Sequence, residues 1–400
     1  MIQATILNLF KKKELLDKKN NYYNNGEEDD YADIQERLIN NSVTAKTASN
    51  KMMQYIIGKG YGEIGETIVN KDKNLTIYNI ANRLIKSKVR QRGAFVHVKY
   101  NMNYEIASLD VLPFQNCKVG KKDDKEYSGK ILYSKDFSDS NSKKQTFDTY
   151  NRDVGVIESQ VRKACGNKEK QLTPSDFSQY KGQLLYINDD YESVYPLSRI
   201  DAVQNDCDSE TQSSIYKNRS LRKGSFGKTV FITPPLIGDD IQKTIFDENG
   251  NQVRNPLYIT AESERDAFKN TVESFFGAEN TGEGVLLETQ YAGEDIEKAF
   301  VIKNYQSNIN DKMFEFTENS VRRNILFAFN DLPLILVEPS EGVFSNSGET
   351  LKEGKRSYWE NNEMERNSIE STMNDLLSNF NGNEIKIQTI PLIVEKPLEL

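Results

Sequence analysis

The pattern of apolar and polar positions predicts one long helix near the middle of the chain, from Tyr195 to Lys223. Its less polar side chains recur at spacings of three and four, which places them on one helix face; they are Ile200, Val203, Cys207, Thr211 and Ile215. Gly224 follows as a C-cap, and a β-rich run covers residues 228–233. A long exposed helix that leads into a small strand module is typical of an extended molecule and not of a closed enzyme domain.

The half of the chain before this helix has a mixed α+β pattern. Alternating apolar positions predict two paired strands, 94–100 and 105–112, joined by a turn at 101–104. Residues 18–30 are polar and charged, which predicts a flexible linker. The remaining predicted elements are a short amphipathic helix at 1–16, two helices within 31–57, a helix at 78–90, and strands at 130–133 and 184–188.

The half after the helix predicts a small strand–helix–strand module between two helices. A hairpin is expected at 244–254, around Asn249-Gly250, and a second long helix at 311–329. Pro333 ends that helix and begins a loop that reaches Glu349. The other predicted elements are a helix at 262–276, strands at 284–289 and 298–303, a last long helix at 350–380 and a closing strand at 385–390.

Composition narrows the classes of function. Hydrophobic residues make up 37% of the 400 residues and charged residues 28%, a balance that suits a protein with a large surface or one that assembles. A net charge of −8 argues against broad electrostatic binding of nucleic acid. The three cysteines predict no disulfide framework and favour a reducing compartment. No apolar run approaches the length that spans a membrane, and no signal peptide is expected.

No motif in the sequence supports catalysis. Gly60-Tyr-Gly62-Glu-Ile-Gly65 has the spacing of a dinucleotide fingerprint, but it follows a helix and opens none, so a turn is the better interpretation. Gly227-Lys228-Thr229 lacks the leading glycine of a phosphate-binding loop. His97 is the only histidine and lies in a predicted strand, which favours a structural role. We therefore expect no enzyme activity, no cofactor and no metal site.

Taken together, several segments make the chain resemble the portal proteins of tailed double-stranded DNA bacteriophages. The segments are YPLSRIDAVQND, SIYKNRSLRKGSFG, VFITPP, GVLLET, MFEFTENSVRRNILFAFNDLPLIL, SEGVFSNSGET and YWENN, with RGAFVHVKY and EIASLDVLPFQNCKVG in the first half. The resemblance covers most of residues 31–390 and is one of element order and loose motifs. It departs from the family at Lys223, where an asparagine is usual.

The resemblance implies an α+β portal-like fold with a fixed order of parts. These are a wing at 1–194 with a flexible arm at 1–30, a stem helix at 195–223, a clip at 224–305, a second stem helix at 306–331, a tunnel loop at 332–349, and a tunnel-loop helix with a C-terminal wing strand at 350–400. The crown of the family is expected to be absent or minimal.

The implied function is a ring of twelve subunits at one capsid vertex that packages and ejects DNA without catalysis. Its implied partners are further copies of itself, double-stranded DNA, the terminase large subunit, a head-tail adaptor and the major capsid protein, with no membrane. The protein is then a virion component that occupies the host cytoplasm before assembly. Two alternatives stay open: another ring-forming virion component, such as a connector or baseplate protein, and a nucleotide-binding enzyme.

Two groups of residues are the expected sites. The loop 332–349 carries glutamates and no lysine or arginine, so it is expected to face DNA without holding it; the residues are Glu338, Glu341, Phe344, Ser345 and Asn346. The two long helices carry more apolar residues than one neighbour can bury, which predicts contacts between subunits; the residues are Ile200, Val203, Ile215, Val321 and Ile325.

Overall fold

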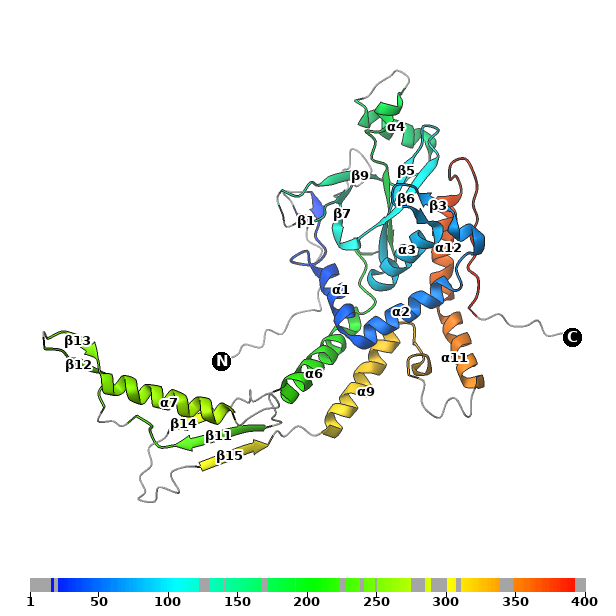
Figure 1. Ribbon diagram of the computed structural model, residues 1–400. Helices are drawn as coiled ribbons and strands as arrows, with labels where there is room; N and C mark the ends of the chain where they lie inside the picture. Colours follow the sequence, from blue (N-terminus) through cyan, green and yellow to red (C-terminus); the bar gives the residue numbers. More distant parts are fainter. Residues whose placement is uncertain are drawn as a thin grey trace. The chain divides into compact units, whose positions relative to one another are not determined.

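A computed structural model shows two compact units in the chain (Figure 1). Residues 1–208 and 320–400 form the first, and residues 209–319 form the second. The described residues are 16–17, 21–121, 130–137, 139, 141–166, 172–190, 192–222, 227–237, 241–248, 250–274, 285–288, 301–306, 311–338 and 348–392. The expected helix at 1–16 lies outside them, apart from its last residue.

The first unit is built on a six-stranded sheet in the order β6-β5-β10-β9-β8-β7. The strands are β5 (Gly93–Tyr100), β6 (Ile106–Leu112), β7 (Cys117–Val119), β8 (Ile131–Tyr133), β9 (Gln145–Thr149) and β10 (Gln183–Asn188). All neighbours are antiparallel except β9 and β10, which pair in parallel over two positions. The predicted hairpin of β5 and β6 is therefore confirmed, as are the strands near 131 and 184.

Helix α3 (Ile77–Gln91) covers one face of this sheet, and two further helices, α1 (Tyr31–Asn41) and α2 (Val43–Ile57), pack against α3. The predicted break near residue 41 is confirmed, because the Ser42 hydroxyl accepts a hydrogen bond from the Ala45 N–H and caps α2. Val96 and Val98 of β5 point to the helices and are fully buried with them in the larger core. Phe95 lies on the opposite face and belongs to a smaller aromatic core.

Residues 21–30 pack onto the sheet, although their polar composition predicts a flexible linker. Tyr22 is 5% exposed, and the Tyr195 hydroxyl donates to the Tyr23 carbonyl at 2.8 Å. The Asp29 carboxylate forms an ion pair with the buried Lys118. Local composition cannot reveal such contacts, since their partners lie far along the chain.

Short elements connect the main ones in the first unit. They are β1 (Leu16–Asp17), β2 (Tyr22–Tyr23), η1 (Gly62–Glu66), β3 (Ile68–Asn70), β4 (Leu75–Thr76), η2 (Phe114–Asn116), α4 (Val154–Ala164), α5 (Pro174–Phe177), η3 (Asp201–Val203) and η4 (Leu334–Leu336). The segment Gly60–Gly65 lies between α2 and β3 and forms a turn with a 3-10 helix. It opens no α-helix, so it lacks the geometry of a dinucleotide site.

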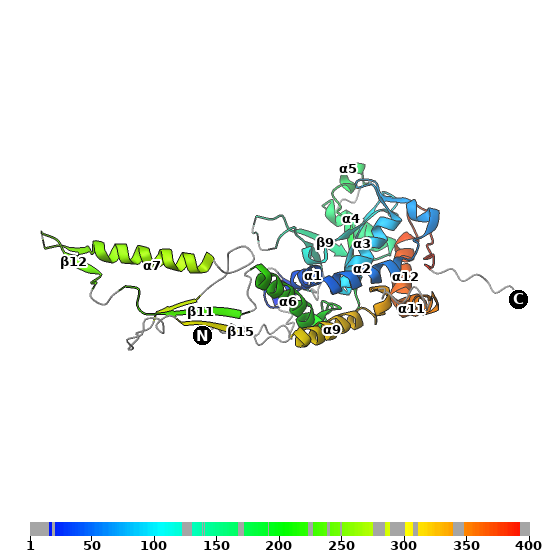
Figure 2. The ribbon, with the colours of Figure 1, turned by 60° about the horizontal axis from the view of Figure 1, so that its bottom comes forward.

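The second unit contains a three-stranded sheet in the order β14-β11-β15 and a separate hairpin (Figure 2). Its elements are β11 (Gly227–Thr233), β12 (Thr244–Phe246), β13 (Gln252–Arg254), α7 (Pro256–Ser274), β14 (Val285–Glu288) and β15 (Val301–Gln306). The predicted hairpin around residue 250 is confirmed. Helix α7 begins six residues before the predicted start at Glu262, with Pro256 in its first turn.

Two long helices connect the units, because each has residues in both. They are α6 (Gln204–Arg222) and α9 (Asp311–Ala328). Helix α6 is shorter than predicted: the chain from Tyr195 to Ile200 is not helical, and the 3-10 turn η3 precedes the helix. The Ser198 N–H donates to the Tyr31 hydroxyl at 3.0 Å, and the Ser198 hydroxyl donates to the Arg90 carbonyl at 2.7 Å. These two bonds hold the segment before η3 against the first unit.

The last long helix of the prediction is two helices, α11 (Gly348–Asn361) and α12 (Glu363–Leu377). The buried side chain of Asn362 separates them and donates to the Tyr358 carbonyl at 2.7 Å. The predicted strand at 385–390 does not form. These residues are extended and bind side chains and loops instead, as when the Ile387 N–H donates to the Asn374 side chain at 2.7 Å.

A polar cluster joins the start of α6, the end of α9 and the junction of α11 and α12. The Arg199 guanidinium donates to the Asn330 side chain at 2.7 Å and to the Glu365 carboxylate at 3.1 Å. The Asn330 amide in turn donates to Glu365 at 2.8 Å and to Asn362 at 3.2 Å. Asn330 has a φ of 56°, which asparagine tolerates better than most residues. We call these four residues the Arg199 cluster.

Arg199→Ala is expected to destabilise the first unit by about 2 kcal/mol, because it leaves the half-buried Glu365 carboxylate and the Asn330 amide without their main partner. The matched control is Arg356→Ala, which removes an exposed ion pair with Glu360 and should cost less than about 0.5 kcal/mol. Urea unfolding followed by the fluorescence of Trp359, the only tryptophan, measures both. Equal midpoints for the two variants contradict the assignment.

Candidate functional site

Helices α6 and α9 run antiparallel and are linked by polar side chains at two levels. Near the start of α6, the Asn324 amide donates to the Asp206 carboxylate at 3.3 Å. Further along α6, the Ser213 hydroxyl donates to the Glu318 carboxylate at 3.2 Å, and Lys217 forms an ion pair with the same carboxylate. Residue numbers rise along one helix as they fall along the other, so the chain leaves the first unit on α6 and returns on α9.

The five residues expected at subunit contacts differ in their surroundings. Ile200 and Ile325 are fully buried and Val321 is 8% exposed, all within the larger core of this chain. Val203 is partly buried against the same core. Ile215 is 39% exposed on α6. Of this group, Ile215 is thus the side chain that offers the most surface to a neighbour.

The expected DNA-facing loop is described only in its first part. The Glu338 carboxylate lies 2.6 Å from the Arg322 guanidinium of α9, and both side chains are partly exposed. Glu341, Phe344, Ser345 and Asn346 lie outside the described residues. The negative charge of Glu338 is therefore paired with the positive charge of Arg322, which the sequence of the loop alone does not indicate.

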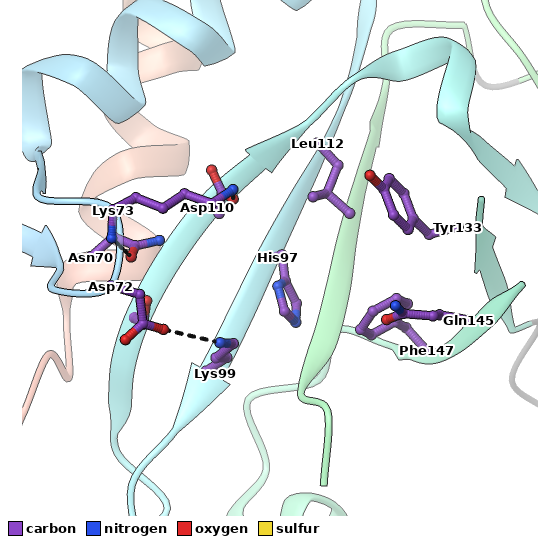
Figure 3. Close-up of a pocket in the computed structure, with 11 residues that line it drawn as sticks. Asn70, Asp72, Lys73, His97, Lys99, Asp110, Leu112, Tyr133, Gln145 and Phe147 are labelled. Carbon is purple, nitrogen blue, oxygen red and sulfur yellow. Dashed lines mark hydrogen bonds and ion pairs between the residues drawn. The ribbon is translucent and has the colours of Figure 1, made fainter. Parts of the chain in front are cut away.

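A hollow of about 220 Å³ lies on the sheet face opposite α3 (Figure 3). Strands β5, β6, β8 and β9 and the turn between β3 and β4 supply its walls. Its lining residues are Asn70, Asp72, Lys73, His97, Lys99, Ser108, Asp110, Leu112, Tyr133, Gln145 and Phe147. Pairing of His97 with Asp110 across β5 and β6, and of Tyr133 with Gln145 across β8 and β9, places these side chains together.

Among the carboxylates that line the hollow, Asp110 has more ion-pair partners than Asp72. Its carboxylate binds Lys73 of the β3–β4 turn and, at 3.1 Å, Arg83 of α3. It also accepts the Val111 N–H at 3.0 Å. Two cations and an N–H therefore surround a carboxylate that is 9% exposed, which fixes its position.

His97 lies at the centre of the hollow (Figure 3). Its Nε2 is 2.7 Å from the Lys181 carbonyl, so this nitrogen carries the proton and donates it. The ring packs edge-on against Phe147. Burial lowers the pKa of His97 below its usual value, and the nearby Lys99 and Lys73 also lower it, while the bond to Lys181 and the Asp110 charge act in the other direction. The sequence favoured a structural role for His97. It could not predict the hollow, because the residues that line the hollow come from five separate segments of the chain.

Among the residues that the structure describes, no group of three or more His, Cys, Asp or Glu side chains could hold a metal ion. No helix within the described ranges is long and apolar enough to cross a membrane. Lys228 of Gly227-Lys228-Thr229 lies in β11, and residues 223–226, which precede this strand, are outside the described part of the chain.

No family model matches the chain, and no curated protein matches its sequence. Among solved structures, the fold is similar to a chain from the neck of a native gene transfer agent particle computed with C12 symmetry. The two share 15% identity over 88% of this chain and 83% of that one, with a TM-score of 0.48. It is also similar to chains from the virion of a native gene transfer agent and from the neck of an empty particle computed with C6 symmetry. Each of these shares 13% identity over 89% of this chain, and over 83% and 84% of theirs, with a TM-score of 0.47.

The pH dependence of stability tests the environment of His97. Because its folded pKa is lowered, the folded state disfavours the protonated ring. Stability is thus complete above the unfolded pKa of about 6.5 and falls as the pH drops through and below it, by at most about 1.4 kcal/mol per pH unit. We expect His97→Gln, which keeps a donor for the Lys181 carbonyl, to remove this slope between pH 7.5 and 5.5.

Urea midpoints measured at intervals over this range give the difference between the two proteins. All carboxylates are common to both, so their titration cancels in the difference. Parallel profiles for wild type and His97→Gln would contradict a buried neutral ring.

Proposed function

We propose that this chain is a portal protein. Twelve copies form a ring at one vertex of a viral capsid, and DNA passes through the ring during packaging and ejection. The ring performs no catalysis. It nucleates the capsid shell and serves as a docking platform for other virion and packaging proteins.

The observation that carries this proposal is the order of elements along the chain. An α/β unit leads into the long helix α6, a separate unit with a three-stranded sheet follows, and α9 returns antiparallel to α6. The 3-10 turn η4 follows α9, and the two-part helix of α11 and α12 comes later in the chain. This order agrees with the wing, stem, clip, stem, tunnel loop and tunnel-loop helix expected from the resemblance of the sequence to portal proteins.

Ring formation requires side chains that a single chain leaves uncovered. Ile215 and Tyr216 on α6 are each 39% exposed, although both are large and adjoin the contact with α9. Phe327 near the end of α9 and Leu334 after it are about half exposed. Apolar surface of this kind is expected to be buried when copies of the chain associate.

The proposed partners follow from this role. The second unit, which includes the predicted clip, contacts the terminase large subunit during packaging and a head-tail adaptor afterwards. The first unit contacts the major capsid protein. The protein occupies the host cytoplasm before assembly and the portal vertex of the virion after it.

The alternative within the same class is another ring-forming virion component, such as a connector or baseplate protein. Subunit number and channel width separate it from a portal, because a portal channel must admit a DNA duplex. A nucleotide-binding enzyme is the alternative from another class. Binding of labelled ATP to the purified protein discriminates it from the structural roles.

Ile215→Asp is expected to abolish rings while leaving the subunit folded. The exposed position tolerates the change in one chain, but the carboxylate is unpaired once a neighbour covers it. Ile325→Asp is unsuitable for this test, because Ile325 is fully buried in its own chain and the change affects folding first.

Val154→Asp provides the control, since Val154 is 52% exposed on α4, away from both long helices in the sequence. Negative-stain images give the subunit number, and sedimentation velocity gives the fraction assembled. Wild-type protein should form rings of twelve with a central channel. Rings of unchanged abundance in Ile215→Asp would remove α6 from the subunit contact.

Glu338→Lys combined with Glu341→Lys is expected to leave rings intact and to slow DNA passage. In a ring, each new lysine becomes a collar of positive charge that holds phosphates by releasing their counterions. The effect should be largest at low salt, where screening is weakest. An in vitro packaging assay with rings of the variant measures the rate.

The control for this experiment is Glu338→Gln with Arg322→Gln. It removes one negative and one positive charge from a pair whose atoms lie 2.6 Å apart, so the net charge of the ring is unchanged. Packaging close to the wild-type rate is expected. If the lysine variant also packages normally at every salt concentration, the loop does not face DNA.

A further inference from the structure

The hollow on the sheet has two chemically different walls (Figure 3). One wall carries charges, with Lys73 and Lys99 beside the carboxylates that pair with them. The other is apolar and aromatic and consists of Leu112, Tyr133 and Phe147. A ligand that fits both walls must combine a charged group with an apolar one.

The charged wall can accept a negative group at little cost. Lys99 Nζ is 3.4 Å from Asp72 Oδ2, and the two side chains are 49% and 78% exposed. A pair so open to solvent contributes little stability, so another carboxylate can replace Asp72 on Lys99. Lys73 is 57% exposed and has two further N–H donors beside the one that binds Asp110. Asp110 meanwhile keeps the guanidinium of Arg83 as a second partner.

Three polar side chains around the hollow have no hydrogen-bond partner in the part of the chain that the structure describes. They are Ser108 of β6, Tyr133 of β8 and Gln145 of β9. In Figure 3, Tyr133 and Gln145 lie on the aromatic side, across from Lys99. Their hydroxyl and amide groups can bind peptide N–H and C=O groups, which a polypeptide ligand offers in abundance.

We propose that this hollow binds a carboxylate side chain of a partner polypeptide, with an apolar neighbour of that side chain against Tyr133 and Phe147. Lys99 and Lys73 bind the carboxylate. The volume of about 220 Å³ suits one or two side chains and is smaller than the roughly 300–1,000 Å³ typical of small-molecule pockets. The inference does not depend on the portal function, because every residue involved belongs to the first unit of a single chain.

The test uses a fluorescein-labelled hexapeptide of alternating Glu and Phe, and fluorescence anisotropy measures its binding to the purified full-length protein. Saturable binding is expected, and the same peptide with Gln in place of Glu should bind about tenfold more weakly or worse. Lys99→Gln should weaken binding of the Glu peptide by a similar factor. Lys86→Gln is the matched control, because Lys86 is an exposed lysine of α3 outside the hollow and its loss should not matter.

Asp72→Asn distinguishes a binding role from a merely structural one. It removes the carboxylate that competes for Lys99, so the Glu peptide should bind more tightly to this variant than to wild type. Circular dichroism verifies that each variant is folded.

Four results would overturn the proposal. These are no binding to wild type, equal binding of the Glu and Gln peptides, equal losses in Lys99→Gln and Lys86→Gln, and weaker binding to Asp72→Asn. Competition by free N-acetylphenylalanine at the same concentration as the peptide would overturn the polypeptide assignment and indicate a small carboxylic acid. None of these results depends on ring assembly, which the Ile215→Asp experiment tests separately.

Discussion

The Arg199 guanidinium is the interaction on which the arrangement of the long helices depends. It lies just before η3 and α6, contacts Asn330 just after α9, and binds Glu365 in the first turn of α12. Burial lowers the pKa of Arg199, whereas the Glu365 charge acts to raise it. A buried guanidinium with such partners has few alternative positions. One cation therefore links the segment before α6, a residue just after the end of α9 and the first turn of α12.

The bases of α6 and α9 also pack through apolar side chains, since Cys207 and Ile325 are fully buried in the larger core. The hydrogen bonds and the ion pair between the two helices come from Asp206, Ser213 and Lys217 of α6. Tyr358 reinforces the same region, since its hydroxyl donates to the Phe329 carbonyl at 3.0 Å and its ring packs edge-on against Tyr55. Ile215 of α6 lies beyond this base and is 39% exposed.

The spacing of apolar residues and the presence of turn-forming residues predicted most of the helices and strands, because both signals depend on neighbours in the sequence. The alternation in 94–100, the turn at 101–104 and the Asn-Gly hairpin each depend on neighbouring residues. The break at Asn362 could not be predicted in this way, since apolar positions continue at helical spacing on both sides of it. The break depends on Asn330 and Arg199, which are distant in sequence. The same reason applies to residues 385–390, whose apolar pattern resembles a strand but whose backbone binds Asn374 and Gly60.

The candidate sites differ in how far the sequence could predict them. A loop poor in cations is visible in composition, so Glu338 could be singled out, whereas its partner Arg322 on α9 could not. The hollow is the opposite case: no local pattern links Lys73, Lys99 and Phe147. The order of strands in the sheet brings Lys99 and Phe147 to one face, and the ion pair with Asp110 holds Lys73 beside them. In particular, β5 places Lys99 two residues from His97, so both point to the open face while Val96 and Val98 enter the core. The alternation of apolar and polar residues that predicted β5 therefore also determines which of its side chains a ligand can reach.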